Sequence, residues 1–238
     1  MNSQNPTLNR SDVHVWFRQT RNVSDAEEQI ANQYLSPEEC SRRDRLVFAI
    51  DRRDYSVSHD LLRRKLSTYE ALNPADWTFQ TNSWGKPSIV GKSQLAFSLS
   101  HTRGFVACAI CLSAEIGIDV EEIRHNLSYL DLAEEYFAKS EVDSLRSCSR
   151  DKGSILFTEL WTLKEAYLKA KGVGISGGLD SIIFECTQGS VTPQKFSKSE
   201  PESTQMFMVS PISGIRIAIA SLCVEPKTIS VFEDVGGQ

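Results

Sequence analysis

The spacing of apolar side chains divides this chain into stretches typical of strands and stretches typical of helices. Alternation with a period of two, or a short apolar run, predicts a strand, whereas a period near 3.6 predicts a helix. The predicted strands are 13–18, 77–80, 95–100, 105–112, 116–120, 181–185, 206–210 and 215–222, with 228–234 as a further edge strand. The predicted helices lie at 24–34, from 37 onward, around 55–69, and at 130–137, 139–146 and 154–171.

The order of these elements repeats between the two halves. In each half a strand is followed by helices and then by further strands. The segment 136–141 has the same pattern as 34–39, where Ser36 and Glu39 are typical of a capping box at a helix start. The repeat predicts a duplication.

The expected fold is therefore α+β, built of two α/β lobes related by pseudo-twofold symmetry. We place the N-terminal lobe at 1–114 and the C-terminal lobe at 115–238. The segment 187–204 is rich in Gly, Ser, Gln and Lys, which predicts a loop inside the second lobe.

Two carboxylates interrupt the apolar strand that begins the second half. Asp119 and Glu121 are two positions apart, so both project from one face of the strand. Neighbouring carboxylates repel each other unless a cation lies between them. Glu165 and Lys169 are four residues apart in a predicted helix and share one face of it. Glu165 beside the first two carboxylates would complete an all-oxygen site that suits Mg²⁺.

Each of these pairs also has a simpler interpretation. Asp119 and Glu121 fit the solvated face of an edge strand, and Glu165 with Lys169 fits a surface ion pair worth a few tenths of a kcal/mol. Taken singly, each pair favours the simpler interpretation. Their joint occurrence favours a site.

Four motifs in fixed order give the chain a family resemblance. Ile116–Glu121 reads Ile-Gly-Ile-Asp-Val-Glu, and Trp161–Lys169 reads Trp-Thr-Leu-Lys-Glu-Ala-Tyr-Leu-Lys. Gly85-Lys86-Pro87 and Ser100-His101 precede them. In order and approximate spacing these motifs resemble the signature of the 4′-phosphopantetheinyl transferases, in the larger surfactin-type subfamily. The resemblance covers roughly 30–225.

The resemblance implies an activity. Such enzymes transfer the 4′-phosphopantetheine arm of coenzyme A to a serine of an acyl or peptidyl carrier protein and release 3′,5′-ADP. It also implies a metal site at Asp119, Glu121 and Glu165, which would hold Mg²⁺ or Mn²⁺ on the pyrophosphate. Glu165 matches the residue proposed as base, either directly or through a metal-bound water. Lys169 matches the lysine that contacts the pyrophosphate.

Coenzyme A contacts are implied for the first lobe as well. Ser100 and His101 match residues near the phosphates, and Lys86 and Pro87 match a loop that packs on the adenine. Without the resemblance, His101 is an ordinary turn histidine. Lys164 could also reach a phosphate, but its helix position points elsewhere. For the 3′-phosphate, candidates in this Arg-rich part of the lobe are Arg45 and Arg53, with Arg43, Arg52 and Arg63.

A carrier protein is the implied macromolecular partner. It is typically acidic, and the segment 124–130 after Glu121 offers Arg124 and apolar side chains as a docking place. The same segment also fits an ordinary strand-to-helix loop. Fatty-acid, polyketide and nonribosomal-peptide carriers all remain open.

Three other functions fit the sequence less well. A catalytically silent module that binds coenzyme A or a carrier would be expected to lack a carboxylate or Lys169, and all are present. A different Mg²⁺-dependent phosphotransferase or nucleotide hydrolase lacks support, because this sequence contains no Gly-x-x-x-x-Gly-Lys-(Ser/Thr) loop. A Ser100–His101 hydrolase is disfavoured because adjacent strand residues face opposite ways.

The composition of the chain limits which partners and which cellular location we expect for it. The 238 residues carry a net charge of −5, which argues against general nucleic-acid binding. No apolar run reaches the roughly 20 residues that span a bilayer, and the first residues lack a secretory apolar region. Cys108 and Cys111 form an isolated Cys-x-x-Cys in an apolar run, which favours reduced thiols over zinc ligands. We expect a cytoplasmic monomer with no membrane or nucleic-acid partner.

Overall fold

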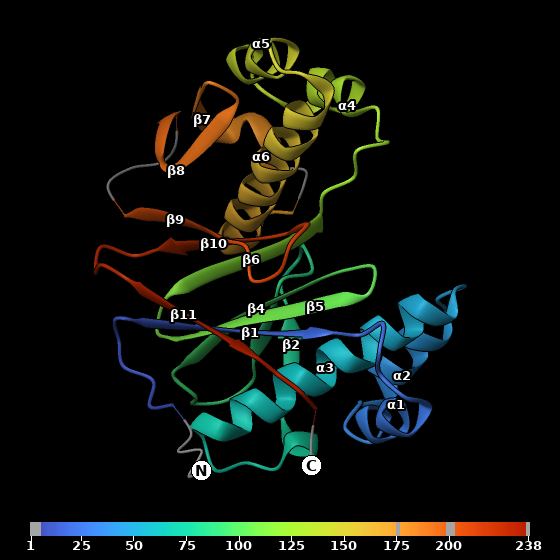
Figure 1. The fold of residues 1–238 in the computed structure, drawn as a ribbon. Coiled ribbons are helices and arrows are strands. Elements are labelled where there is room, and N and C mark those ends of the chain that lie inside the picture. Colours follow the sequence, from blue (N-terminus) through green and yellow to red (C-terminus); the bar gives the residue numbers. More distant parts are fainter. Residues whose placement is uncertain (1–5, 175–176, 199–202, 237–238) are drawn as a thin grey trace. The chain divides into compact units, whose positions relative to one another are not determined.

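Each of the two compact units of this chain has a long helix packed against a β-sheet, as the computed structural model in Figure 1 shows. The structure describes residues 6–174, 177–198 and 203–236. The first unit comprises Met1–Asn82, Pro87–Ala114 and Lys227–Gln238, and the second comprises Ser83–Lys86 and Glu115–Pro226. The expected α+β class is confirmed, and the duplication stays a prediction.

The first unit is built on a four-stranded sheet in the order β11-β1-β5-β4. Its strands are β1 (Asp12–Gln19), β4 (Leu95–Thr102), β5 (Phe105–Leu112) and β11 (Thr228–Glu233). β4 and β5 pair antiparallel as the predicted hairpin around Gly104. The long helix α3 (Ala49–Tyr69) packs on this sheet through a buried apolar stripe that includes Val57, Leu61, Leu62 and Leu66.

Two short helices precede α3 in this unit. Both α1 (Asp25–Asn32) and α2 (Pro37–Asp44) begin at a serine that closes a capping box with a glutamate three residues later. The helix start predicted at Ser36 is thereby confirmed. The unit is completed by η1 (Pro74–Asp76) and the small ribbon of β2 (Phe79–Thr81) and β3 (Pro87–Ile89).

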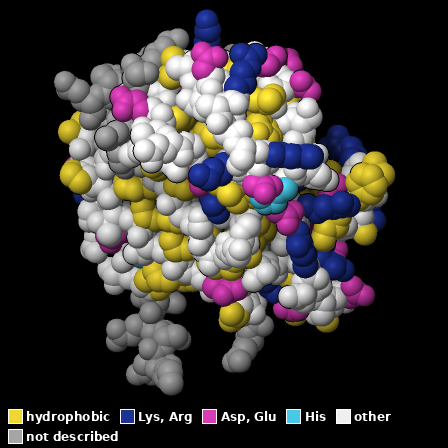
Figure 2. Space-filling model, turned by 45° about the horizontal axis from the view of Figure 1, so that its top comes forward, with side chains coloured by type: hydrophobic (Ala, Val, Ile, Leu, Met, Phe, Trp, Pro, Cys, Tyr) yellow, Lys and Arg dark blue, Asp and Glu magenta, His cyan; other side chains and the backbone are white. Residues whose placement is uncertain are grey.

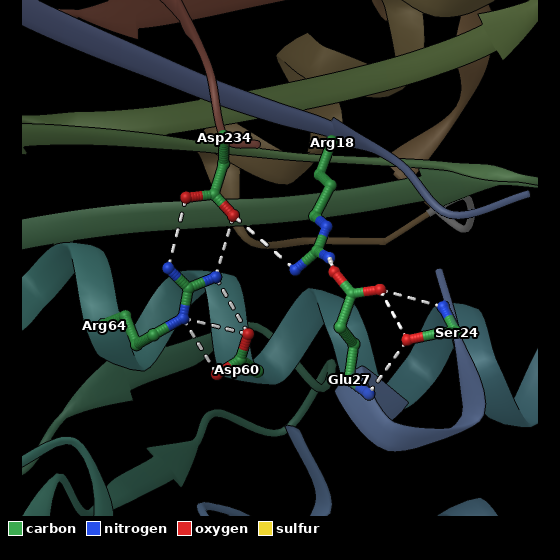
Figure 3. A network of polar contacts seen from close by, with 6 residues as sticks. All are labelled: Arg18, Ser24, Glu27, Asp60, Arg64 and Asp234. Carbon is green, nitrogen blue, oxygen red and sulfur yellow. Dashed lines mark hydrogen bonds and ion pairs between the residues drawn. The ribbon is translucent and has the colours of Figure 1, made fainter. Parts of the chain in front are cut away.

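The last strand, β11, runs parallel to β1 at one edge of this sheet. Asp234, just beyond it, accepts hydrogen bonds from the Arg64 guanidinium at 3.1 and 2.8 Å, and Arg18 lies 3.8 Å away (Figure 3). Burial alone raises the pKa of Asp234, but Arg64 and Lys65 outweigh it and lower the pKa to about 2. The end of the chain therefore belongs to the first unit, although the sequence placed it in the lobe 115–238.

The second unit is built on a three-stranded antiparallel sheet in the order β6-β10-β9. Its strands are β6 (Glu115–Glu122), β9 (Thr204–Val209) and β10 (Ile215–Leu222). One face packs against α6 (Arg150–Lys171), with Ala218, Ala220 and Met206 in the same core as the apolar residues of the helix. The remaining elements are α4 (Tyr129–Tyr136), α5 (Lys139–Arg146), η3 (Leu179–Ser181), β7 (Ile183–Thr187) and β8 (Ser190–Lys198).

The loop predicted at 187–204 is wrong over most of its described part. Residues 190–198 form β8, which pairs with β7 as a hairpin. Gln188 and Gly189 both have positive φ, 55° and 77°, as a tight two-residue turn requires. The polar composition hid the strand, although Val191 and Phe196 pack against the core of the unit. Residues 199–202 of that prediction lie outside the described residues.

Charges of both signs cover the surface. On the face in Figure 2, Lys and Arg side chains are interspersed with Asp and Glu side chains.

All six cysteines are free thiols, and Cys108 and Cys111 are fully buried in β5. Within the described parts of the chain, no helix is long and apolar enough to cross a membrane.

Candidate active site

The acidic residues of β6 lie on the face of the sheet that α6 covers. Asp119 is opposite Ala218 of β10, which packs in the same core as α6, and Glu121 is opposite Arg216. The alternation of the strand keeps both carboxylates on this one face. Asp119 is 5% exposed, and Glu121, nearer the end of the strand, is half-buried.

Gly117 sets how closely the helix lies on the strand. A Cβ atom at this position would lie 2.0 Å from the carbonyl oxygen of Ala166 and 2.4 Å from the backbone nitrogen of Ala170. Only glycine permits this approach, because both neighbours are backbone atoms that cannot turn away. Asp119 follows two residues later on the same face, so the contact brings α6 beside the acidic pair.

Glu165 and Lys169 of α6 meet Asp119 at this contact. The Lys169 ammonium lies 2.7 Å from Oδ1 of Asp119. Burial and the negative charge of Asp119 raise the pKa of Glu165, and Lys169 partly opposes this. The structure therefore joins Asp119, Glu165 and Lys169, three of the residues selected from the motifs.

The donor chemistry fits a hard cation, although the side chains do not form a ready cage. Within the described residues, no group of three or more His, Cys, Asp or Glu side chains is arranged to hold a metal ion. The oxygen donors of Asp119, Glu121 and Glu165 are the type that Mg²⁺ prefers. Burial raises the pKa of Glu165 and the charge of Asp119 adds to the shift, so a second positive charge beside these carboxylates would favour their ionised forms.

A half-open pocket of about 210 Å³ lies next to Glu121. It is lined by residues of β6, the following loop, α4 and α6: Glu121, Glu122, Arg124, Leu127, Leu132, Phe157, Thr158 and Trp161. The loop contributes exposed Arg124 and Leu127, as expected for 124–130, whereas Tyr129 is buried and stacks on Phe157. Sequence reasoning missed Phe157 as a pocket residue, because its helical spacing equally fits a core position.

Ser100 and His101 belong to the first unit, on β4. Ser100 is buried and His101 is exposed, so the two side chains take opposite faces of the strand. Burial raises the pKa of Asp54, and hydrogen bonds from Gly104 and Thr20 and the charge of His101 oppose the shift. His101 thus lies near a carboxylate on α3.

The candidate arginines differ sharply in their partners. Arg53 binds Glu28 at 2.8 Å and Asp25 at 3.2 Å. Arg63 is buried and donates to Glu39 and to the carbonyls of Pro74 and Trp77, which makes it a structural residue. Arg43 binds Asn32 and Asp44, and Arg52 donates to the carbonyls of Leu46 and Val47.

Arg45 has the most open position of this group. It is exposed and donates to the carbonyl oxygen of Ser41, and it has no acidic partner within the described residues.

Lys86 closes the C-terminal end of α6. Its ammonium donates to the carbonyl of Ala170 and to Glu115, both at 2.6 Å. A cation there complements the negative end of the helix dipole. Pro87, the next residue, opens β3 opposite Thr81 in the first unit.

Comparison with known proteins gives consistent matches. Residues 115–220 match the model of the 4′-phosphopantetheinyl transferase superfamily. The chain is 34% identical to 4′-phosphopantetheinyl transferase HetI of Nostoc sp., over 72% of this chain and 73% of that protein. It is 29% identical to 4′-phosphopantetheinyl transferase Sfp of Bacillus subtilis, over 84% and 88%.

A solved structure, that of Thermotoga maritima holo-[acyl-carrier-protein] synthase, also matches part of the chain. It covers 45% of this chain and 61% of its own, with 21% identity and a TM-score of 0.35, a likeness too small to bear on the fold.

Proposed function

The chain belongs to the 4′-phosphopantetheinyl transferase superfamily, and we propose that its reaction takes place where β6 meets α6. It transfers the 4′-phosphopantetheine arm of coenzyme A to a serine of a carrier protein. The observation that carries the assignment of the site is the ion pair of Lys169 with Asp119, together with Glu165, which lies near enough to sense both charges. We further propose that one chain acts as a monomer.

Asp119, Glu121 and Glu165 would hold Mg²⁺, or Mn²⁺ in its place. Such an ion would neutralise charge on the pyrophosphate of coenzyme A and orient it. Lys169 is 31% exposed at its side chain, so it can exchange the Asp119 carboxylate for a phosphate oxygen.

Glu165 is the residue of this chain best suited to accept the proton of the carrier serine. Its raised pKa makes its carboxylate a stronger base than an ordinary glutamate. The pH profile of the transfer rate tests whether Glu165 accepts this proton directly or acts only as a metal ligand.

Further contacts with coenzyme A are proposed for the residues that match the upstream motifs and for the exposed arginine. His101, exposed on β4, would donate to the phosphates with Ser100 as its neighbour. Arg45 would bind the 3′-phosphate, because its guanidinium is exposed. Arg53 would have to leave Glu28 to do so, which ranks it lower. Lys86 and Pro87 would pack on the adenine.

The carrier protein would dock at the segment 124–130. Exposed Arg124 attracts an acidic partner, and exposed Leu127 opens onto the apolar pocket that contains Trp161. We expect Arg124→Glu with Leu127→Ser to raise the KM for the carrier about tenfold with the KM for coenzyme A unchanged. Asn126→Ser, exposed in the same segment, is the matched control. An unchanged KM for the carrier rejects this docking surface.

The transfer itself is tested by the intact mass of an apo carrier protein incubated with this protein, coenzyme A and Mg²⁺. We expect a gain of one phosphopantetheine, lost without Mg²⁺ and severely reduced in Glu165→Gln. Glu134→Gln, at a surface ion pair with Arg146, should behave as the wild type. Coenzyme A binding without any gain on several carriers would instead identify a silent binding module.

A further inference from the structure

Lys164, in the middle of the Trp-Thr-Leu-Lys-Glu motif, does not reach the acidic site. Its side chain is fully buried and lies 2.9 Å from Oε2 of Glu141, whose side chain is 1% exposed. Two charged side chains are seldom buried this deeply unless they form an ion pair.

The Lys164 ammonium has three partners for its three protons. Besides Glu141 it donates to the carbonyl oxygens of Leu179 at 2.8 Å and Ile182 at 2.6 Å. The rings of Phe137 and Phe184 lie 5.1 and 5.8 Å from it, close enough to stabilise the charge. No proton is left for a phosphate oxygen.

Glu141 is held equally firmly. Its Oε1 accepts from the backbone N–H of Phe184 at 2.9 Å, and Oε2 accepts from that of Ala138 at 3.1 Å. The pair therefore ties α6 to the start of α5, to η3 and to the start of β7.

This anchor bears directly on the neighbouring residue. Successive helix residues are about 100° apart around the axis, so fixing Lys164 fixes the direction of Glu165. Two and six residues further along, the backbone of Ala166 and of Ala170 lies close against Gly117. The helix is thus held at two points around its axis, and Glu165 lies between them, toward Asp119.

We propose that Lys164 is a positioning residue, which with Glu141 sets the rotation of α6 and so holds Glu165 against Asp119 without touching substrate. This rests on the proposed function of the acidic site. It differs from the pyrophosphate contact that the motif implies for Lys169.

The first test is the double variant Glu141→Gln with Lys164→Met. It removes both buried charges together, leaves an acceptor for the N–H of Phe184, and releases the carbonyls of Leu179 and Ile182. We expect a folded protein whose kcat falls at least tenfold, with the KM for coenzyme A within twofold of wild type. Lys152→Met, an exposed lysine on the same helix, is the control and should leave both constants unchanged.

A milder variant covers the case in which the double variant does not fold. Glu141→Asp keeps both charges but shortens the acidic side chain by one methylene, which shifts the ammonium group of Lys164. We expect kcat several-fold lower and the KM for coenzyme A unchanged. An unchanged kcat in a folded variant overturns the proposal, and so does a raised KM with unchanged kcat, which would mean that Lys164 binds coenzyme A. Absence of transfer in the wild type would instead reject the proposed function.

Discussion

Two lysines five residues apart on α6 have opposite surroundings. Lys164 is fully buried, and its carboxylate partner Glu141 is buried with it. Lys169 is 31% exposed and pairs with Asp119, whose side chain is 7% exposed. Aromatic rings and backbone carbonyl oxygens surround the Lys164–Glu141 pair, whereas the Lys169–Asp119 pair is partly exposed to solvent. A buried pair holds the structure in place, whereas a half-open pair can exchange its partner for a ligand.

The largest effect is expected from Lys164→Met alone. It leaves the carboxylate of Glu141 buried without its cation, which typically costs about 3–5 kcal/mol. The free energy of unfolding, measured with urea, should fall by about that amount. A loss below about 1 kcal/mol would show that the two lysine environments are not as different as their burial indicates.

Lys169→Met should show the reverse pattern. The half-open pair contributes little to folding, about 0–1 kcal/mol. Loss of a cation at the pyrophosphate, by contrast, should lower kcat/KM about 100- to 1,000-fold, as removal of one stabilising donor does in other enzymes. Steady-state transfer kinetics and urea unfolding measure the two effects. Normal kinetics in this variant would contradict a role for Lys169.

Gly117→Ala alters the contact between β6 and α6 without changing either lysine of the two ion pairs. The new Cβ meets the backbone of Ala166 and Ala170, so β6 and α6 must move apart at a cost of about 3 kcal/mol, the upper end of ordinary overpacking. We expect weaker coenzyme A binding in calorimetry. Gly153→Ala, on the same helix, is the control, since the atoms nearest to its Cβ would belong to the side chain of Tyr129 and not to the backbone of β6. Equal coenzyme A affinity in both variants would contradict the role of Gly117.

The network at Asp234 in the first unit provides a third cation–carboxylate cluster, one that titrates (Figure 3). Its folded-state pKa of about 2 lies below the ordinary value near 3.8, so the folded state favours the ionised form. The stabilisation is complete above about pH 4 and is lost as the pH falls through 2.

This difference in pKa corresponds to about 2 kcal/mol. Asp234→Asn should therefore lower the stability at pH 7 by about that amount and flatten its dependence on pH below 4, as urea unfolding between pH 2 and 7 would show. An unchanged dependence on pH would rule out Asp234 as the titrating group.

Much of the fold follows from local patterns in the sequence. The alternation at 95–100, the capping box at Ser36 and the glycine after α6 each act within a few residues, and the structure has these elements. β8 was missed because its polar residues resemble a loop, and the pairing of β11 with β1 joins the two ends of the chain, which no local pattern records.

The acidic site could be predicted only in part. The spacing of Asp119, Glu121, Glu165 and Lys169 gave the faces on which they lie. It could not show that Arg63 is buried on backbone carbonyls, or that Lys86 caps α6. These partners come from distant segments, and a lysine in a motif looks the same in sequence whether it anchors a helix or binds a phosphate.

The contrast between Lys164 and Lys169 is tested most directly by reductive methylation of the native protein, with and without coenzyme A and Mg²⁺, followed by peptide mass spectrometry. The structure predicts that Lys169 is methylated in the free protein and protected by coenzyme A, whereas Lys164 stays unmodified in both samples. Methylation of Lys164 in the folded protein, or equal methylation of Lys169 with and without coenzyme A, would contradict the account.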